Sequence, residues 1–108
     1  IARIKDAIEK EGFKERVYTE KEIEYCESKN VQKYQSYSGR FAAKEAIFKI
    51  RNEKGISFKN HIKVSPFELD QKETTAILDF EKKQQWFTIC FDEFDSFTLV
   101  YAFEKNKQ

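Results

Sequence analysis

The chain has 108 residues, of which 40% are hydrophobic and 16% aromatic, so it can form one folded domain with one core. Charged residues make up 36%, and no apolar stretch approaches the roughly 18 residues of a membrane-spanning helix. With no signal-peptide pattern at its start, we expect a cytoplasmic protein without a membrane segment. The net charge of only +1 argues against a general nucleic-acid binder.

The charge is unevenly distributed along the chain. Residues 1–64 contain 15 Lys and Arg against 10 Asp and Glu, whereas residues 65–108 contain 5 against 9. A basic first half could face an anionic partner or a phosphorylated ligand. A solvated helical surface would explain the same imbalance equally well.

The two cysteines, Cys26 and Cys90, form no CxxC motif, and no cluster of histidines accompanies them. A zinc site is therefore not indicated, and we expect two buried free thiols, with a disulfide as the alternative. The chain contains no Met and begins at Ile1. We therefore expect the complete protein to contain a further N-terminal segment.

Two helices are predicted in the first part of the chain. Isoleucines at helical spacing predict a helix over residues 1–8, and Gly12 follows as a stop signal. A second helix is predicted from about Thr19 to Ser28. Its start is marked by a capping box, in which the side chains of Thr19 and Glu22 would each bond to the other residue's backbone amide.

A longer helix is predicted over residues 31–51. Aromatic residues recur there every seven positions, at Tyr34, Phe41 and Phe48. Gly39 lies inside this pattern and costs about 1 kcal/mol relative to Ala. It could permit close helix packing or mark a break between two helices.

The second half of the chain alternates apolar and polar residues, which is typical of strands. We predict strands over residues 56–64, 76–80, 86–91 and 97–103. Three or four strands, mostly antiparallel, would follow the helices. Helices first and strands later indicate the α+β class.

Chemistry is concentrated on the predicted long helix. Arg40 and Lys44 lie one helical turn apart, as do Glu45 and Lys49. Three cations could bind phosphates, while one carboxylate could bind Mg²⁺, which usually takes one or two carboxylates and fills its other positions with water and phosphate oxygens. The alternative is an ordinary surface pair between Glu45 and Lys49, worth about 0.3–0.5 kcal/mol.

The run Arg40-Phe41-Ala42-Ala43-Lys44-Glu45-Ala46-x-x-Lys49 resembles the second signature of the phosphopantetheinyl transferases, in the form used by small bacterial holo-acyl-carrier-protein synthases. The segment from Glu15 to Cys26 and the start Ile1-Ala2-Arg3-Ile4 also resemble that family. The resemblance covers residues 1–51 and combines two boxes at family-like spacing, which makes it specific.

This resemblance implies a single 4′-phosphopantetheinyl transferase domain over residues 1–108 that lacks its first strand. The implied activity is Mg²⁺-dependent transfer of 4′-phosphopantetheine from coenzyme A to a serine of acyl carrier protein, with release of 3′,5′-ADP, in fatty acid biosynthesis. It also implies a homotrimer with active sites between subunits. By resemblance, Arg3 and Arg16 dock the acidic carrier protein.

The resemblance also assigns roles to the long helix. Glu45 would be a metal ligand and would help to activate the serine, directly or through water, while Lys49 would lie near the reacting phosphate. Arg40 and Lys44 would bind the phosphates of coenzyme A. The second metal ligand of the family is an Asp in a strand that would precede Ile1.

Three further departures from the family pattern concern the second half of the chain. Asn52 to Gly55 replaces the family's Gly-Thr-Gly loop, and Phe91 aligns with a late family histidine. Residues 65–85 match the family poorly. The single histidine, His61, lies in a predicted strand and is interpreted as a structural or surface residue.

Two other functions stay open. The first is a non-catalytic module of the same fold that binds carrier protein or coenzyme A without turnover. The second, less favoured, is an RNA-binding domain in which aromatic side chains stack on bases, although the same residues could simply alternate into the core. These aromatic residues are Trp86, Phe87, Phe91, Phe97, Tyr101 and Phe103.

Overall fold

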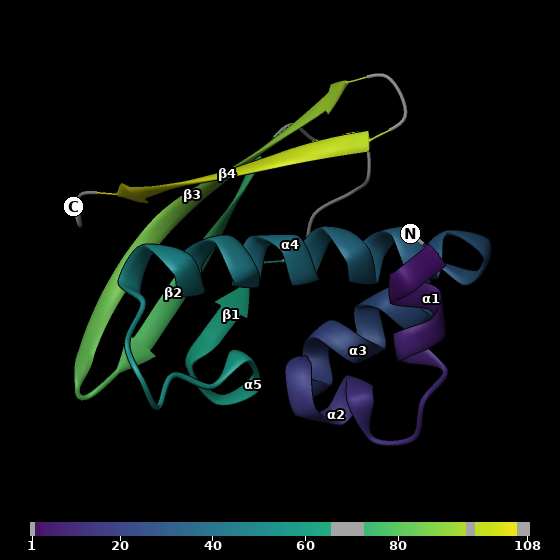
Figure 1. Ribbon diagram of the computed structural model, residues 1–108, viewed down its shortest axis with the longest axis horizontal. Coiled ribbons are helices and arrows are strands. Elements are labelled where there is room, and N and C mark those ends of the chain that lie inside the picture. Colours follow the sequence, from purple (N-terminus) through teal and green to yellow (C-terminus); the bar gives the residue numbers. More distant parts are fainter. Residues whose placement is uncertain (1, 66–72, 95–96, 106–108) are drawn as a thin grey trace.

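The computed structural model describes the backbone of residues 2–65, 73–94 and 97–105, and the side chains of residues 5–65 and 73–90. Helices come first and pack beside a sheet formed by the second half of the chain, as Figure 1 shows. The predicted α+β class is therefore confirmed.

The helical half contains the elements that the sequence predicts, with two short additions. The capping box is formed as expected: Glu22 N donates to Thr19 Oγ1 at 3.1 Å, and Thr19 N donates to Glu22 Oε1 at 2.8 Å. A one-turn helix and a short 3₁₀ segment lie between the predicted helices. The elements are α1 (Ala2–Ile8), α2 (Phe13–Val17), α3 (Glu20–Glu27), η1 (Asn30–Gln32) and α4 (Lys33–Arg51).

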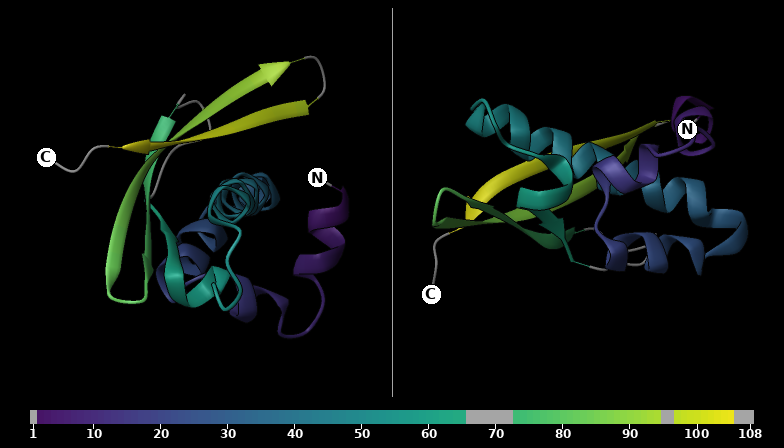
Figure 2. Two further views of the ribbon diagram at one scale, coloured as in Figure 1. Left: turned by 60° about the vertical axis from the view of Figure 1, so that its left-hand side comes forward. Right: turned by 90° about the horizontal axis from the view of Figure 1, so that it is seen from below.

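The longest helix, α4, runs without a break through Gly39, so the alternative of two helices is wrong. It ends at Asn52, whose φ of 49° is left-handed and stops the helical hydrogen-bond pattern. In Figure 2 this helix lies against one face of the sheet, with α3 and α5 (Phe58–His61) beside it.

The predicted strand over residues 56–64 is wrong in its first part. Residues 58–61 form α5, and of the predicted range only Ile62–Val64 forms a strand, β1. Ser57 caps the helical turn, because its Oγ accepts from Asn60 N at 3.1 Å. The apolar residues at 58 and 62 fit a helical spacing of four as well as an alternating pattern, so this local capping decided the outcome.

The sheet has the order β1-β2-β3-β4, and each neighbouring pair is antiparallel. The further strands are β2 (Glu73–Phe80), β3 (Lys83–Phe94) and β4 (Phe97–Lys105). Four antiparallel strands within the described residues agree with the sequence prediction, although β3 extends beyond its predicted end. Ala76 faces Phe87 across the β2–β3 ladder, and both are buried toward α4.

Two groups of buried side chains meet along α4. The first contains Ala43 and Ile47 of α4 together with apolar residues of the sheet. The second contains Tyr37 of α4 with Tyr18, which follows α2, and Cys26 of α3. One helix therefore serves both cores, and its rotation about its own axis determines which side chains face each of them.

Both cysteines are free thiols, so the disulfide alternative does not apply. Cys26 is fully buried, as predicted, and Cys90 is half-buried. In the part of the chain that the structure describes, no helix is long and apolar enough to cross a membrane.

Candidate functional site

The four signature side chains of α4 divide between two directions. Successive residues of an α-helix are about 100° apart, so Arg40 and Lys44 share one side, and Glu45 and Lys49 share another. Arg40 and Lys44 are 1% and 0% exposed, whereas Glu45 is half-buried and Lys49 is exposed. The structure therefore does not bring all four side chains to one surface.

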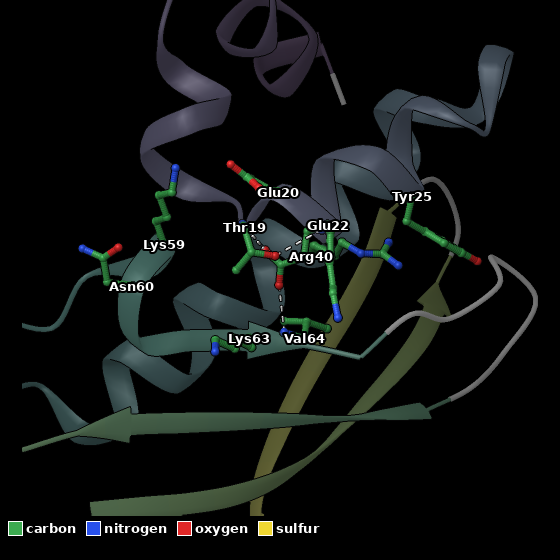
Figure 3. Close-up of a pocket in the computed structure, with 10 residues that line it drawn as sticks. Thr19, Glu20, Glu22, Tyr25, Arg40, Lys59, Asn60, Lys63 and Val64 are labelled. Carbon is green, nitrogen blue, oxygen red and sulfur yellow. Dashed lines mark hydrogen bonds between the residues drawn. The ribbon is translucent and has the colours of Figure 1, made fainter. Parts of the chain in front are cut away.

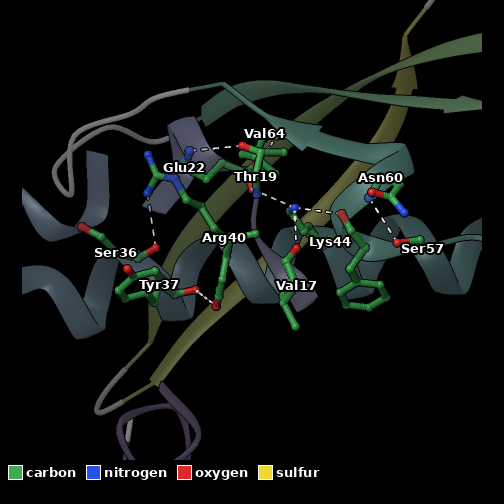
Figure 4. Close-up of polar contacts among 12 residues, drawn as sticks. Val17, Thr19, Glu22, Ser36, Tyr37, Arg40, Lys44, Ser57, Asn60 and Val64 are labelled. Carbon is green, nitrogen blue, oxygen red and sulfur yellow. Dashed lines mark hydrogen bonds and ion pairs between the residues drawn. The ribbon is translucent and has the colours of Figure 1, made fainter. Parts of the chain in front are cut away.

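Lys44 lies between α4 and the elements that surround it, as Figure 4 shows. Its ammonium group forms an ion pair with Glu22 Oε1 at 2.7 Å. It also donates to the carbonyl oxygens of Val17 at 2.8 Å and Phe58 at 2.9 Å. Burial lowers the pKa of Lys44, while the neighbouring carboxylate opposes that shift. Its contact with coenzyme A phosphates stays a prediction.

Glu22 has a role that local sequence reasoning missed. Besides closing the capping box, its second carboxylate oxygen accepts from Val64 N of β1 at 2.8 Å. One buried carboxylate thus contacts the start of α3, the middle of α4 and the edge strand of the sheet. The sequence showed only the cap, because its partners Lys44 and Val64 lie 22 and 42 positions further on.

A cavity of about 590 Å³ opens between α3, α5 and β1, as Figure 3 shows. Four cationic side chains contribute to its wall, together with two carboxylates and an aromatic ring. The excess of cations over carboxylates suits a ligand that carries phosphates. The lining residues are Thr19, Glu20, Lys21, Glu22, Tyr25, Arg40, Lys59, Asn60, Lys63 and Val64.

Arg40 connects the signature helix to this cavity. Its guanidinium carbon lies 4.6 Å from the centre of the Tyr25 ring, and its Nη1 donates to Ser36 O at 3.2 Å. A guanidinium held against an aromatic face is fixed in direction, which favours recognition of a phosphate. Lys21, Lys59 and Lys63 were not singled out from the sequence, where only the basic balance of the first half hinted at them.

Glu45 and Lys49 lie on the other side of α4. Neither side chain makes a hydrogen bond or ion pair with the described residues, so the alternative of a Glu45–Lys49 surface pair is not formed. An oxygen donor without a competing partner suits a hard cation such as Mg²⁺. The described residues contain no group of three or more metal-binding side chains. A metal at Glu45 would therefore take further oxygens from substrate, water or residues outside the description, as Mg²⁺ commonly does.

The two arginines predicted to dock the carrier protein lie on different short helices. Arg16 is exposed on α2, close to Gly12, whose φ of 84° is left-handed. The side chain of Arg3 on α1 lies outside the described residues. The carrier-protein role of both stays a prediction.

His61 has the structural role that the sequence suggested. Its Nδ1 accepts from Ser57 N at 2.7 Å, and its ring meets the edge of the Phe80 ring at 4.9 Å between centres. Both contacts stabilise the turn that leads into β1. His61 thus stabilises the segment before β1, although its side chain does not line the cavity.

The aromatic residues of the sheet do not form one platform where the structure describes them. Phe87 is fully buried toward α4, while the neighbouring Trp86 is half-buried on the opposite face, across from Ile77. This alternation is the arrangement predicted as the alternative to an RNA-binding surface. The side chains at positions 91, 97, 101 and 103 lie outside the description.

Comparison with known proteins gives the same family as the signature on α4. The family model described as the 4′-phosphopantetheinyl transferase superfamily matches residues 1–102. The chain belongs to this superfamily. The match extends well beyond the resemblance in residues 1–51 and includes the sheet.

Curated relatives of this chain are named holo-[acyl-carrier-protein] synthase. Those of Ruminiclostridium cellulolyticum and Clostridium tetani are 61% identical over 51 residues and 49% identical over 70 residues. That of Cytophaga hutchinsonii is 54% identical over 50 residues. These matches cover 45%, 64% and 45% of this chain, but only 38%, 52% and 39% of the three relatives. No solved structure matches the chain significantly.

Proposed function

We propose that the protein is a holo-acyl-carrier-protein synthase, which transfers 4′-phosphopantetheine from coenzyme A to a serine of acyl carrier protein. The family match and the names of the relatives support this activity. The observation that carries it is the carboxylate of Glu45, which has no partner among the described residues and lies one turn before Lys49 on the signature helix. A carboxylate and a cation on one exposed side can act together on a metal-bound phosphate.

In the proposed reaction, the serine oxygen of the carrier protein bonds to the β-phosphorus of coenzyme A. The bond from that phosphorus to the oxygen bridging to the α-phosphate breaks, and 3′,5′-ADP leaves with the electron pair. Glu45 takes the serine proton, directly or through water, and Lys49 stabilises negative charge on the phosphate. Glu45 also holds Mg²⁺, which when bound neutralises the pyrophosphate and orients it.

The cavity beside α4 supports a role for Arg40 in binding the phosphates of coenzyme A. Its guanidinium belongs to the cavity wall and is held by Ser36 O and the Tyr25 ring. Lys59 and Lys63 extend the cationic wall, so we add them as candidates for the same ligand.

The proposed function also includes a carrier-protein partner, a homotrimer and a cytoplasmic location. Arg16, and by resemblance Arg3, would meet the acidic surface of the carrier protein by charge complementarity. The complete protein would act in fatty acid biosynthesis in the cytoplasm, as a homotrimer with active sites between subunits. By resemblance, the second metal ligand would be an Asp.

The test is the intact mass of acyl carrier protein after incubation with coenzyme A, Mg²⁺ and the complete protein. We expect a mass gain of one phosphopantetheine group that disappears when Mg²⁺ is chelated. Replacing Glu45 by Ala should lower the rate by about 100-fold or more. Glu24→Ala is a matched control, since it removes an exposed carboxylate of α3 that lies outside the cavity.

Two results would contradict the enzyme hypothesis. The first is a folded wild-type protein that produces no mass gain, and the second is a Glu45→Ala variant as active as the Glu24→Ala control. If calorimetry then shows binding of coenzyme A without transfer, the protein is the non-catalytic module. Calorimetry measures coenzyme A binding and mass spectrometry measures transfer. The two measurements on the same samples therefore distinguish the enzyme from the non-catalytic module.

A further inference from the structure

The three protons of the Lys44 ammonium group are all engaged inside the protein. Its Nζ lies 2.7, 2.8 and 2.9 Å from Glu22 Oε1, Val17 O and Phe58 O. A lysine ammonium group has three donors, so this arrangement leaves none for a phosphate. The side chain is also 0% exposed. Lys44 therefore uses all its donors on acceptors within the protein, where a phosphate-binding lysine would use them on its ligand.

The partners of this ion pair come from four elements, α2, α3, α5 and β1. Val17 ends α2, Phe58 begins α5, and Glu22 lies in the first turn of α3 while accepting from Val64 N of β1. The pair lies where the helical core and the sheet core meet. Figure 4 shows these contacts converging on one point of α4.

Fixing Lys44 also fixes the direction of Glu45, because the two are neighbours about 100° apart on the helix. Lys49 lies four residues after Glu45, about 40° away around the axis. At a side-chain radius of about 5–6 Å, a helix rotation of about 10° moves both side-chain ends by about 1 Å. A displacement of about 1 Å can lower a catalytic rate by about 100-fold.

We propose that the buried Glu22–Lys44 ion pair is a positioning device that sets the rotation of α4 and thereby aims Glu45 and Lys49 at the reacting phosphate. This inference rests on the proposed transferase function. It makes Lys44 a positioning residue that acts through Glu45, and Glu22 its partner. The pair then determines kcat, while coenzyme A affinity depends on the cavity wall that includes Arg40.

The experiment compares Lys44→Met, Glu22→Gln and the double variant Glu22→Gln/Lys44→Met with the wild type. Lys44→Met takes the ammonium donor away from Glu22, Val17 O and Phe58 O, and Glu22→Gln leaves the buried Lys44 charge without its counter-charge. Each single change should therefore lower the melting temperature by about 10 °C or more. The double variant removes both charges, so it should recover part of that loss, with only the two carbonyl oxygens still lacking the donor. Lys33→Met is the control, since it removes a partly exposed ion pair with Glu27 at 3.4 Å and a contact with the Tyr34 ring at 5.2 Å, both away from the buried pair.

The positioning role predicts a particular pattern in the double variant. We expect kcat to fall by about 100-fold while KM and the calorimetric Kd for coenzyme A change by less than about 3-fold. Nuclear Overhauser contacts from the methyl groups of Ala43 and Ile47 to the sheet should also change, since both side chains are packed in the sheet core. The Lys33→Met control should match the wild type in all four measurements.

Two kinetic outcomes would overturn the proposal. A coenzyme A Kd weakened about 10-fold or more at unchanged kcat would show that Lys44 contacts a phosphate directly. A kcat that recovers together with the melting temperature would show a purely stabilising role. If the wild type transfers nothing, the proposed function fails instead, and the methyl contacts decide the rotation: an unchanged pattern in the double variant refutes it, and an altered one supports it.

Discussion

Cys26 shows how burial controls a single titrating group in this fold. Its side chain is fully enclosed in the helical core near Tyr18 and Tyr37. Burial raises the pKa of the Cys26 thiol to about 11, although nearby Arg40 opposes this shift. Burial likewise raises the pKa of Tyr18 above its ordinary value. The helical core thus favours the protonated, neutral forms of Cys26 and Tyr18.

We predict that stability falls when the pH rises above about 9. In the unfolded chain the thiol loses its proton near its ordinary pKa, whereas the folded state keeps the proton up to about pH 11. The folded state binds more protons in that window, so the stabilising contribution is complete below about pH 9 and is lost toward about pH 11. The loss can reach about 2–3 kcal/mol.

Urea unfolding at about pH 8, 9 and 10 measures this dependence. The Cys26→Ala variant should show a flatter decrease between about pH 9 and 10, because it lacks the titrating thiol. Ordinary tyrosines titrate only near about pH 10 and contribute later. An identical decrease in the variant and the wild type would contradict the assignment to Cys26.

At the scale of elements, α3 begins with a cap that also takes part in tertiary structure. Glu22 accepts from Thr19 N within the cap, while its contacts with Lys44 and Val64 connect the helix to the rest of the fold. The Thr19 hydroxyl has only the local task, since it accepts from Glu22 N at 3.1 Å. The two halves of one capping box therefore differ in importance.

Replacing Thr19 by Ala should lower the free energy of unfolding by about 1 kcal/mol, because one backbone amide of the first turn loses its acceptor. Thr19→Ser keeps the hydroxyl and should stay within a few tenths of a kcal/mol of the wild type. Urea titrations of both variants, followed by circular dichroism, test this difference. Equal losses in the two variants would show that the hydroxyl is not what matters.

The whole molecule depends on α4, whose buried side chains belong to both cores. Ile47 is fully buried against the sheet, whereas Ile50, three residues later on the same helix, is 51% exposed. The ring of Phe58 on α5 packs against both Phe41 and Phe48 of α4, at 5.7 and 5.5 Å between centres. These shared contacts favour unfolding of the chain as one unit, in keeping with the predicted single domain.

We expect Ile47→Ala to cost about 2–5 kcal/mol, since it leaves a cavity between helix and sheet. The matched change Ile50→Ala should alter stability by no more than about 0.5 kcal/mol. Helical circular dichroism and Trp86 fluorescence should report the same transition midpoint for the wild type and both variants. Separate midpoints for the two signals would indicate two independently folding units and contradict the single domain.

Features that depend on neighbours along the chain could be predicted from the sequence. The capping box from Thr19 to Glu22, the helical period of α4 and the alternating residues of β2 follow from local hydrogen bonding and side-chain period, whereas the continuity of α4 through Gly39 did not. The family also followed from sequence, since the signature from Arg40 to Lys49 keeps its spacing on one helix.

Only the tertiary structure decided which signature side chains face a partner and which face the core. Residue spacing placed Arg40 and Lys44 together, but it could not show that Lys44 is enclosed by Glu22, Val17 and Phe58. It also could not assemble the cationic cavity wall, which comes from α3, α4, α5 and β1. The physical reason is that burial and ion pairing depend on which distant elements pack against a helix, and a helical period specifies a direction without specifying what lies there.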